Sequence, residues 1–358
     1  MIGSGVADEM RDDLQRLGFG DGDHGFAIPF DINVKLEDLS VIDVFATTPD
    51  GQVQRLKRVN SETTRQEEPA AQVRRPPPPL SSFPLPIVDT KAEPVFILGA
   101  ARSGTSAMAQ GLLKCGIYGG FEEGHFLWMI RRFLLTIHAF YEDNGEDALP
   151  VRFTLLSRVP AQHMVDAVRA AFVSSMGQLF PDGKWLDKTP RPEMIEAAPV
   201  MQELWPNARF IFMRRRGLEN VYSRLTKFPT ISFKEHCQDW ARNMEVWLRV
   251  RDLLGGAPME IEQLAVALEP ERTAQEVAAF LGLDQVASRH LAKAFASDRP
   301  EVTTKHFGTA MQIDRLGWTD QQIYTFRKEC GPMMAAYGYS YTDSYFARPV
   351  RSITTAKL

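Results

Sequence analysis

The pattern of apolar and polar positions divides the chain into three parts. Up to about residue 62, short apolar runs are separated by turn residues, and Pro49 to Gly51 marks one such turn. The runs that predict strands are Phe26 to Ile28, Val41 to Phe45 and Val53 to Leu56, whereas the glycine-rich stretch from Gly18 to Gly25 predicts a turn. The first part is therefore predicted to be a small β module over residues 1–62.

The second part, residues 63–92, is polar and then rich in proline. Four consecutive prolines follow Arg74 and Arg75. Proline cannot donate a hydrogen bond to a sheet or continue a helix, so this segment is predicted to be an extended, semi-rigid linker between two domains. Recruitment of a domain that binds proline-rich peptides is the alternative interpretation of the same tract.

The third part, residues 93–345, alternates short apolar runs with amphipathic segments. The predicted strands are 95–98, 185–187, 209–213 and 259–261, and the predicted helices start at 105 and cover 165–179, 192–204, 218–225, 233–253, 270–281 and 320–336. Strands that alternate with helices form a parallel sheet with both faces covered. The fold class is therefore α/β, with residues 346–358 left as a C-terminal tail.

Charge and cysteine content argue against several classes of protein. The net charge of −4 and the pI near 6.0 argue against a protein whose whole surface binds nucleic acid, but they allow a local basic pocket for a small anion. The three cysteines, Cys115, Cys237 and Cys330, are too widely spaced for a disulfide framework or a zinc site. Apolar runs stay below the ~18 residues of a membrane span, and the first residues are acidic, so the expected location is the cytoplasm.

A glycine-rich loop follows the first strand of the third part. The run from Val95 to Leu98 leads into Gly99, and the loop continues through Arg102, Ser103, Gly104, Thr105 and Ser106 into a helix. Such a loop directs backbone N–H groups and a helix N-terminus at an anion. A magnesium-dependent nucleotide kinase needs a lysine where Thr105 stands. The loop therefore predicts an anion site, with the kinase as a rival interpretation.

A second basic motif follows the strand at 209–213. Arg214, Arg215 and Arg216 end this strand, and Ser223 lies on the helix that comes next. An arginine at a strand end and a serine on the following helix can converge on one phosphate, the arginine through its planar fork of donors. The residues alone leave open which of the three arginines does so.

These two motifs resemble those of the sulfotransferase superfamily. Residues 102–106 are similar to its 5′-phosphosulfate loop, and its 3′-phosphate site has an arginine and a serine eight residues apart, a spacing that selects Arg215 with Ser223. The resemblance covers about seven-tenths of the chain. It implies a P-loop-like fold, the donor 3′-phosphoadenosine-5′-phosphosulfate (PAPS) and a reaction without a metal. Residues 20–26 resemble a small β-sandwich module found beside bacterial glycosyltransferases and sulfotransferases.

The resemblance also indicates catalytic groups. Lys188 follows the strand at 185–187, at the edge where parallel sheets bind ligands. Aryl and steroid sulfotransferases carry a catalytic histidine two residues later, but this chain has Pro190 there. Tyrosylprotein sulfotransferases instead use a glutamate twenty-one residues after the loop arginine, which corresponds to Glu123. We therefore expect Glu123 to be the general base, with Arg102 and Lys188 holding the sulfonate.

Several alternatives stay open. Glu122 and His125 could each replace Glu123 as base, and Lys305 resembles the family's late segment that closes over the nucleotide. Aromatic and arginine residues between 124 and 159 are expected to line an acceptor pocket, for which a carbohydrate or glycolipid hydroxyl is favoured. A peptide tyrosine, a polyketide or a small alcohol is the alternative acceptor. A non-catalytic nucleotide-binding protein is a further rival.

Overall fold

The computed structural model describes residues 9–10, 23–25, 41–47, 53–60, 85–121, 123–148, 155–156, 159–297 and 311–347. The chain divides into two compact units, Met1–Pro79 and Leu80–Leu358. This division lies within the proline-rich tract that the sequence predicts to be a linker. The domain bounds drawn from the sequence stay predictions.

The first unit contains two antiparallel strand pairs. Strand β1 (Glu9–Met10) pairs with β2 (Asp23–Gly25), and β3 (Val41–Thr47) pairs with β4 (Val53–Asn60). The strands predicted at 41–45 and 53–56 agree with β3 and β4, which extend further. The prediction of a turn through Gly25 is wrong at its end, because Asp23–Gly25 forms a strand. The strand predicted at 26–28 lies outside the described residues.

The second unit is built on a five-stranded sheet in which every neighbouring pair is parallel, in the order β6-β7-β5-β8-β9. The strands are β5 (Val95–Gly99), β6 (Gly119–Gly120), β7 (Trp185–Lys188), β8 (Arg209–Arg214) and β9 (Met259–Glu262). The central strand β5 is fully buried along its length, as expected for a continuous apolar run in a parallel sheet. The predicted α/β class is confirmed.

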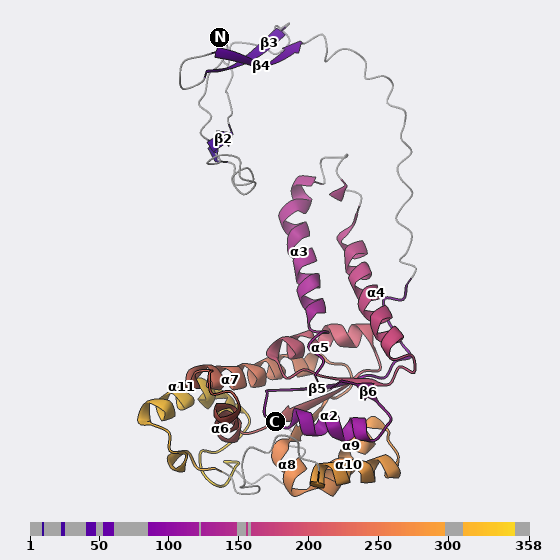
Figure 1. Cartoon of the computed structure of the whole chain (residues 1–358), viewed down its shortest axis with the longest axis vertical. Helices are drawn as coiled ribbons and strands as arrows, with labels where there is room; N and C mark the ends of the chain where they lie inside the picture. Colours follow the sequence, from indigo (N-terminus) through magenta and orange to yellow (C-terminus); the bar gives the residue numbers. More distant parts are fainter. Residues whose placement is uncertain are drawn as a thin grey trace. The chain divides into compact units, whose positions relative to one another are not determined.

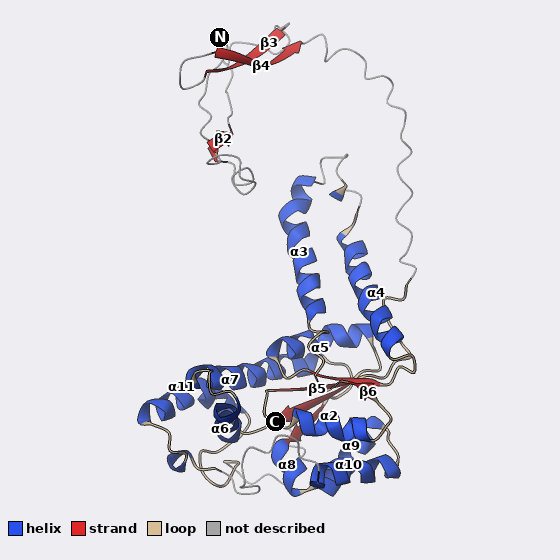
Figure 2. Ribbon diagram, in the orientation of Figure 1, coloured by secondary structure: helices blue, strands red, loops and turns tan. Residues whose placement is uncertain are grey.

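Helices cover both faces of this sheet (Figure 2). They are α2 (Thr105–Lys114), α3 (Met129–Ala148), α4 (Ala161–Leu179), α5 (Pro192–Leu204), α6 (Gly217–Lys227), α7 (Phe233–Val250), α8 (Gln263–Leu268), α9 (Pro270–Leu281), α10 (Gln285–Ser297) and α11 (Asp320–Ala336). The helices α3, α8 and α10 were not predicted from the sequence. None of the described helices is long and apolar enough to cross a membrane.

The alternation of side chains along the strands explains the two layers. On β5, Phe96 and Leu98 point to one face and join a core with α5 and α7, whereas Val95 and Ile97 point to the other and join α2, α9 and α10. Large aromatic side chains fill the first core, where the rings of Phe212 and Trp247 stack with centroids 4.5 Å apart. Burial on both faces therefore fixes the register of the strands, and with it the position of each strand end.

Two helices stand away from the sheet. Helices α3 and α4 lie side by side and project from the layer that contains α5 (Figure 1). Helix α3 follows directly on the loop that carries Glu123, and α4 leads into β7, which ends in Lys188. Each helix of the pair is therefore connected to the candidate site at its end nearest the sheet.

Candidate active site

The glycine-rich loop between β5 and α2 has the geometry of an anion site. Gly99 (φ 138°), Arg102 (φ 72°) and Gly104 (φ 89°) all adopt positive φ values, while Ser103 between the last two does not. Alternation of handedness in successive residues turns their backbone N–H groups toward one side. A Cβ at position 99 would lie 2.3 Å from the Met213 carbonyl oxygen, so glycine is required where β5 approaches β8.

The N-terminus of α2 adds further donors to this loop. Gly104 precedes the helix, and no side chain caps it within the described part of the chain. The first turn also lacks acidic residues, so its backbone N–H groups and positive dipole end are available to an anion. The hydroxyl of Ser103 is buried and accepts from the Asn220 side-chain amide at 3.0 Å, so this residue shapes the loop from inside.

The second predicted phosphate site lies directly beside the first. Arg102 Nε donates to Ser223 Oγ at 3.1 Å, and Arg215 Nη1 donates to the Arg102 carbonyl oxygen at 2.9 Å. The loop, the end of β8 and helix α6 thus bring these three residues together. Asn220, which sequence reasoning missed, also belongs here, since its amide donates to the Ala101 carbonyl at 2.9 Å.

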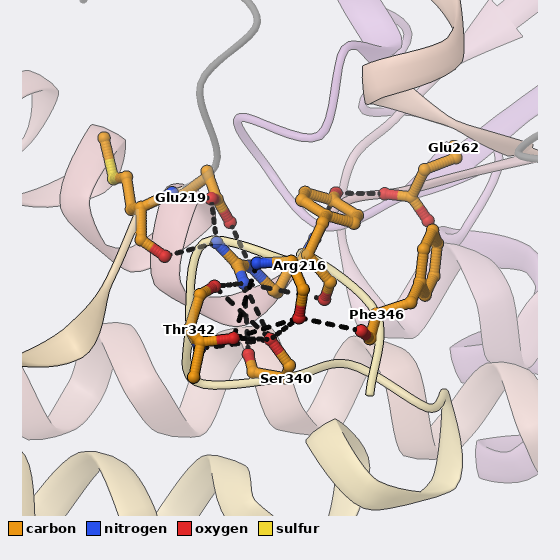
Figure 3. A network of polar contacts seen from close by, with 9 residues as sticks. Arg216, Glu219, Glu262, Ser340, Thr342 and Phe346 are labelled. Carbon is orange, nitrogen blue, oxygen red and sulfur yellow. Dashed lines mark hydrogen bonds and ion pairs between the residues drawn. The ribbon is translucent and has the colours of Figure 1, made fainter. Parts of the chain in front are cut away.

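The structure distinguishes the three consecutive arginines by their partners. Arg214 is buried and pairs with Glu260 at 3.0 Å and Glu262 at 3.2 Å. Arg216 is buried in a network with Glu219, Ser340 and Thr342 (Figure 3). Arg215 is the arginine of this set that reaches the loop.

A buried donor beside the loop fits a ligand that accepts hydrogen bonds. Arg215 Nε is buried without a hydrogen-bond partner among the residues that the structure describes. Burial also lowers the pKa of the Arg215 guanidinium. An unpartnered buried donor is costly, and a phosphate oxygen would satisfy it.

The predicted catalytic residues meet at the end of β7. Lys188 is 2% exposed, its Nζ contacts the Glu123 carboxylate, and it donates to Ser106 Oγ at 3.3 Å. The other Glu123 oxygen lies 2.5 Å from His125 Nε2. Ser106, Lys188, Glu123 and His125 therefore form one continuous chain of polar contacts, whereas the alternative base Glu122 lies outside the described residues.

A layer of contacts holds this chain in place from behind. Thr189 Oγ1 accepts from the His125 backbone N–H at 2.9 Å and donates to Asp187 at 2.8 Å. Burial raises the pKa of the Asp187 carboxyl to about 6. A Cβ at Gly124 would lie 1.7 Å from an Asp187 oxygen, so the loop fits against β7 only with glycine there. Sequence reasoning missed these three supporting residues, although the Asp-Lys-Thr run at the end of a strand is a signal for Asp187 and Thr189.

Aromatic residues lie close in sequence to the candidate base. Phe121 is 61% exposed and Phe126 is 43% exposed, and each lies within three residues of Glu123. Trp128 Nε1 donates to the His125 carbonyl at 3.0 Å, and the guanidinium groups of Arg132 and Arg191 lie 5.0 and 5.1 Å from its ring. The segment that follows Glu123 therefore carries both exposed aromatic side chains and cationic groups.

The described residues contain no group of three or more His, Cys, Asp and Glu side chains that could hold a metal ion. Lys305 lies outside the described part of the chain.

The chain was compared with solved structures, with curated proteins and with models of protein families. The solved structures that the chain is similar to include sulfotransferase STF9 from Mycobacterium avium, at 13% identity and a TM-score of 0.43, covering 70% of this chain and 76% of that chain. They also include the sulfotransferase domain of the Synechococcus PCC 7002 olefin synthase, at 16% identity and a TM-score of 0.37, covering 69% of this chain and 98% of that one. No curated protein matches the chain.

A model of the sulfotransferase family matches residues 94–287, which is more than half of the chain. The matched segment contains the loop from Arg102 to Ser106, Glu123, Lys188 and the pair formed by Arg215 and Ser223. The chain therefore belongs to the sulfotransferase family.

Proposed function

We propose that this sulfotransferase transfers the sulfuryl group of PAPS to the hydroxyl group of an acceptor. The observation that carries the proposal is the convergence of two anion sites. The loop before α2 lies in hydrogen-bond contact with Arg215 and with Ser223, through Arg102. Two neighbouring anion sites suit a nucleotide that carries a phosphosulfate at one position and a phosphate at another.

The loop would hold the 5′-phosphosulfate. Residues 102–106 supply backbone N–H groups, the hydroxyls of Thr105 and Ser106, and the Arg102 charge. Arg215 and Ser223 would hold the 3′-phosphate. Arg215 Nε supports this assignment, because it is buried without an acceptor in the part of the chain that the structure describes, and a phosphate oxygen is such an acceptor.

Each step of the transfer is assigned to a residue of this chain. Glu123 accepts the proton of the acceptor hydroxyl as the acceptor oxygen bonds to sulfur. Lys188 donates to the bridging oxygen as the bond from that oxygen to sulfur breaks, and it neutralises the charge that leaves with adenosine 3′,5′-bisphosphate. Arg102 and the loop N–H groups orient the sulfonate. Charge stabilisation thus comes from side chains and backbone.

The contacts of Glu123 suggest how donor binding prepares the base. Lys188 and His125 each contact one of its two carboxylate oxygens. A bound phosphosulfate would compete with Glu123 for Lys188, because both are anions within reach of the same ammonium. Loss of the Lys188 contact would then leave that carboxylate oxygen free to accept from the acceptor hydroxyl once the donor is in place.

The acceptor is proposed to be a carbohydrate or glycolipid hydroxyl. Exposed Phe121 and Phe126 lie within three residues of Glu123 in the sequence, and aromatic faces suit the apolar faces of sugar rings. Incubation with PAPS and candidate acceptors, followed by mass spectrometry for the added sulfonate, tests this directly. Sulfation of a peptide tyrosine, a polyketide or a small alcohol in place of a sugar would reject the acceptor class and keep the reaction.

The donor site has its own test, which compares adenosine 3′,5′-bisphosphate with 5′-AMP by calorimetry. Charge-assisted hydrogen bonds contribute about 1.5 to 3 kcal/mol net, so the bisphosphate should bind roughly 10- to 150-fold more tightly. Arg215→Ala should remove most of this preference, whereas Arg102→Ala should weaken both nucleotides through their shared 5′ group. Equal binding of the two nucleotides by the wild type would overturn the assignment of the donor.

A further inference from the structure

The peptide unit between Arg215 and Arg216 is held at both of its polar atoms. Trp240 Nε1 donates to the Arg215 carbonyl oxygen at 2.9 Å, and the Arg216 N–H donates to Tyr345 Oη at 3.0 Å. Both partner side chains are buried. Because a peptide unit is planar, two hydrogen bonds on opposite edges fix its orientation and therefore the ψ angle of Arg215. The backbone from which the Arg215 side chain departs is thus set from outside the phosphate site.

Tyr345 is itself firmly held. Its hydroxyl donates to the Glu262 carboxylate on β9, and its ring centroid lies 4.7 Å from the Arg216 guanidinium. It also has a φ of 57°, in the left-handed region that side chains other than glycine rarely adopt. Such a conformation costs energy and persists only where the surroundings determine it, and strained residues of this kind cluster at functional sites.

The Arg216 side chain connects the C-terminal segment, residues 339–346, to the end of β8 (Figure 3). It donates to the carbonyl oxygens of Thr342 at 2.6 Å, Ser340 at 3.2 Å and Met311 at 2.7 Å, and it pairs with Glu219. Tyr339 adds a hydrogen bond to Glu262 at 2.8 Å. The Arg216 side chain is therefore used to hold the C-terminal segment.

The three consecutive arginines therefore have divided roles. Arg214 and Arg216 anchor the strand end through internal ion pairs, and the residue between them is directed at the loop. A side chain that must meet one phosphate needs a backbone that does not rotate, since small misplacements at a binding site are costly. Trp240 and Tyr345 supply that constraint through their hydrogen bonds to the peptide unit.

We propose that Tyr345 and Trp240 are positioning residues for nucleotide selection: by fixing the peptide unit between Arg215 and Arg216, they aim Arg215 at the 3′-phosphate. The C-terminal segment thereby becomes part of the specificity of the donor site, although no residue of it belongs to the phosphate loop. The inference rests on the proposed role of Arg215 in binding PAPS.

The test measures the ratio of affinities for adenosine 3′,5′-bisphosphate and 5′-AMP by calorimetry. Tyr345→Phe keeps the ring over Arg216 and removes only the hydroxyl. We expect the preference for the bisphosphate to fall about 2- to 10-fold, equivalent to one net hydrogen bond, with 5′-AMP affinity unchanged. Trp240→Phe removes the hydrogen bond to the Arg215 carbonyl oxygen, at the other edge of the same peptide unit. This variant should show the same selective loss of preference. It keeps the test decisive if Tyr345→Phe folds poorly.

Tyr337→Phe is the matched control. It also removes a buried tyrosine hydroxyl, but one that donates to the backbone carbonyl of Met244 at 3.0 Å and has no hydrogen bond to the peptide unit between Arg215 and Arg216. The ratio in this variant should equal that of the wild type. An unchanged ratio in folded Tyr345→Phe and Trp240→Phe, or an equal loss in Tyr337→Phe, would overturn the positioning role. A wild type without any preference would instead mean that the proposed donor site is wrong.

Discussion

Among single residues, His125 has a constrained backbone close to the candidate base. Its φ is 51°, in the left-handed region, and its backbone is held by Thr189 at the N–H and by Trp128 at the carbonyl. Its imidazole nonetheless remains about half exposed beside Glu123. This pattern of a fixed backbone and an accessible ring places a second proton acceptor within reach of the first.

The role of Glu123 as general base predicts a selective loss of turnover. Glu123→Gln keeps the shape of the side chain and removes its basicity, so kcat should fall on the order of 10²-fold or more. Binding of adenosine 3′,5′-bisphosphate should remain nearly intact. Steady-state kinetics combined with calorimetry measure the two effects separately.

His125→Gln is the comparison for this prediction. If His125 only supports Glu123, its variant should retain more activity than Glu123→Gln. Full activity in Glu123→Gln together with an inactive His125→Gln would assign the base to His125.

At the scale of elements, strand β9 contributes a buried carboxylate to the C-terminal network. Glu262 is fully buried, pairs with Arg214 and accepts from Tyr339 and Tyr345. Burial raises its pKa from 4.5 to about 7, and the charge of Glu219 adds to this, while Arg214 and the two tyrosines oppose it. The folded state therefore retains a proton that the unfolded chain has lost between these two pH values.

This retention predicts a pH-dependent stability with a definite sign. Because the folded state binds more protons, the free energy of unfolding should fall as pH rises from about 4.5 to about 7, and then level off. The loss amounts to about 3 kcal/mol at most. Glu262→Gln lacks this titration, so urea unfolding at pH 5, 6, 7 and 8 should show the wild type losing stability relative to the variant. A constant difference across this range would contradict the buried titration.

The elements that the sequence predicted are those with a strong side-chain pattern. Strand β5 is a continuous apolar run that ends in glycine, so both the strand and the loop after it could be located. Strand β6 consists of Gly119 and Gly120, which carry no side chains to form a pattern, and its pairing with β7 alone defines it. Helix α3 has a polar C-terminal half and exposed aromatic residues, so its apolar positions do not form one regular helical pattern in the sequence.

The same distinction separates the predicted from the missed parts of the site. Arg102, Glu123, Lys188, Arg215 and Ser223 were selected by motif and spacing, and the structure brings them into contact in two neighbouring clusters. The support of His125 by Thr189 and Asp187 joins segments 64 residues apart, through the fit of a loop against a strand end. Spacing along the chain contains no information about such a fit, whereas tertiary structure determines it.

At the scale of the whole molecule, the second unit is expected to fold without the first. Near its start, the Asp89 N–H donates to the Leu204 carbonyl at 2.8 Å, and the Asp89 carboxylate accepts from the N–H groups of Lys91 and Ala92. A shortened chain that begins at Leu85 should therefore unfold cooperatively and bind adenosine 3′,5′-bisphosphate like the full chain. Calorimetry and thermal unfolding provide the measurement. Insolubility of the shortened chain would mean that the sulfotransferase unit depends on residues 1–84.

The paired helices α3 and α4 form one long excursion of the chain between the two candidate catalytic residues. At the end of the pair nearest the sheet, α3 is joined to the loop that carries Glu123 and α4 to the strand that ends in Lys188 (Figure 1). The contact between the Glu123 carboxylate and the Lys188 ammonium therefore closes a loop of chain that contains both helices. We expect changes of length at the outer ends of these helices to leave that contact in place, so the excursion can vary in length while the candidate site stays the same.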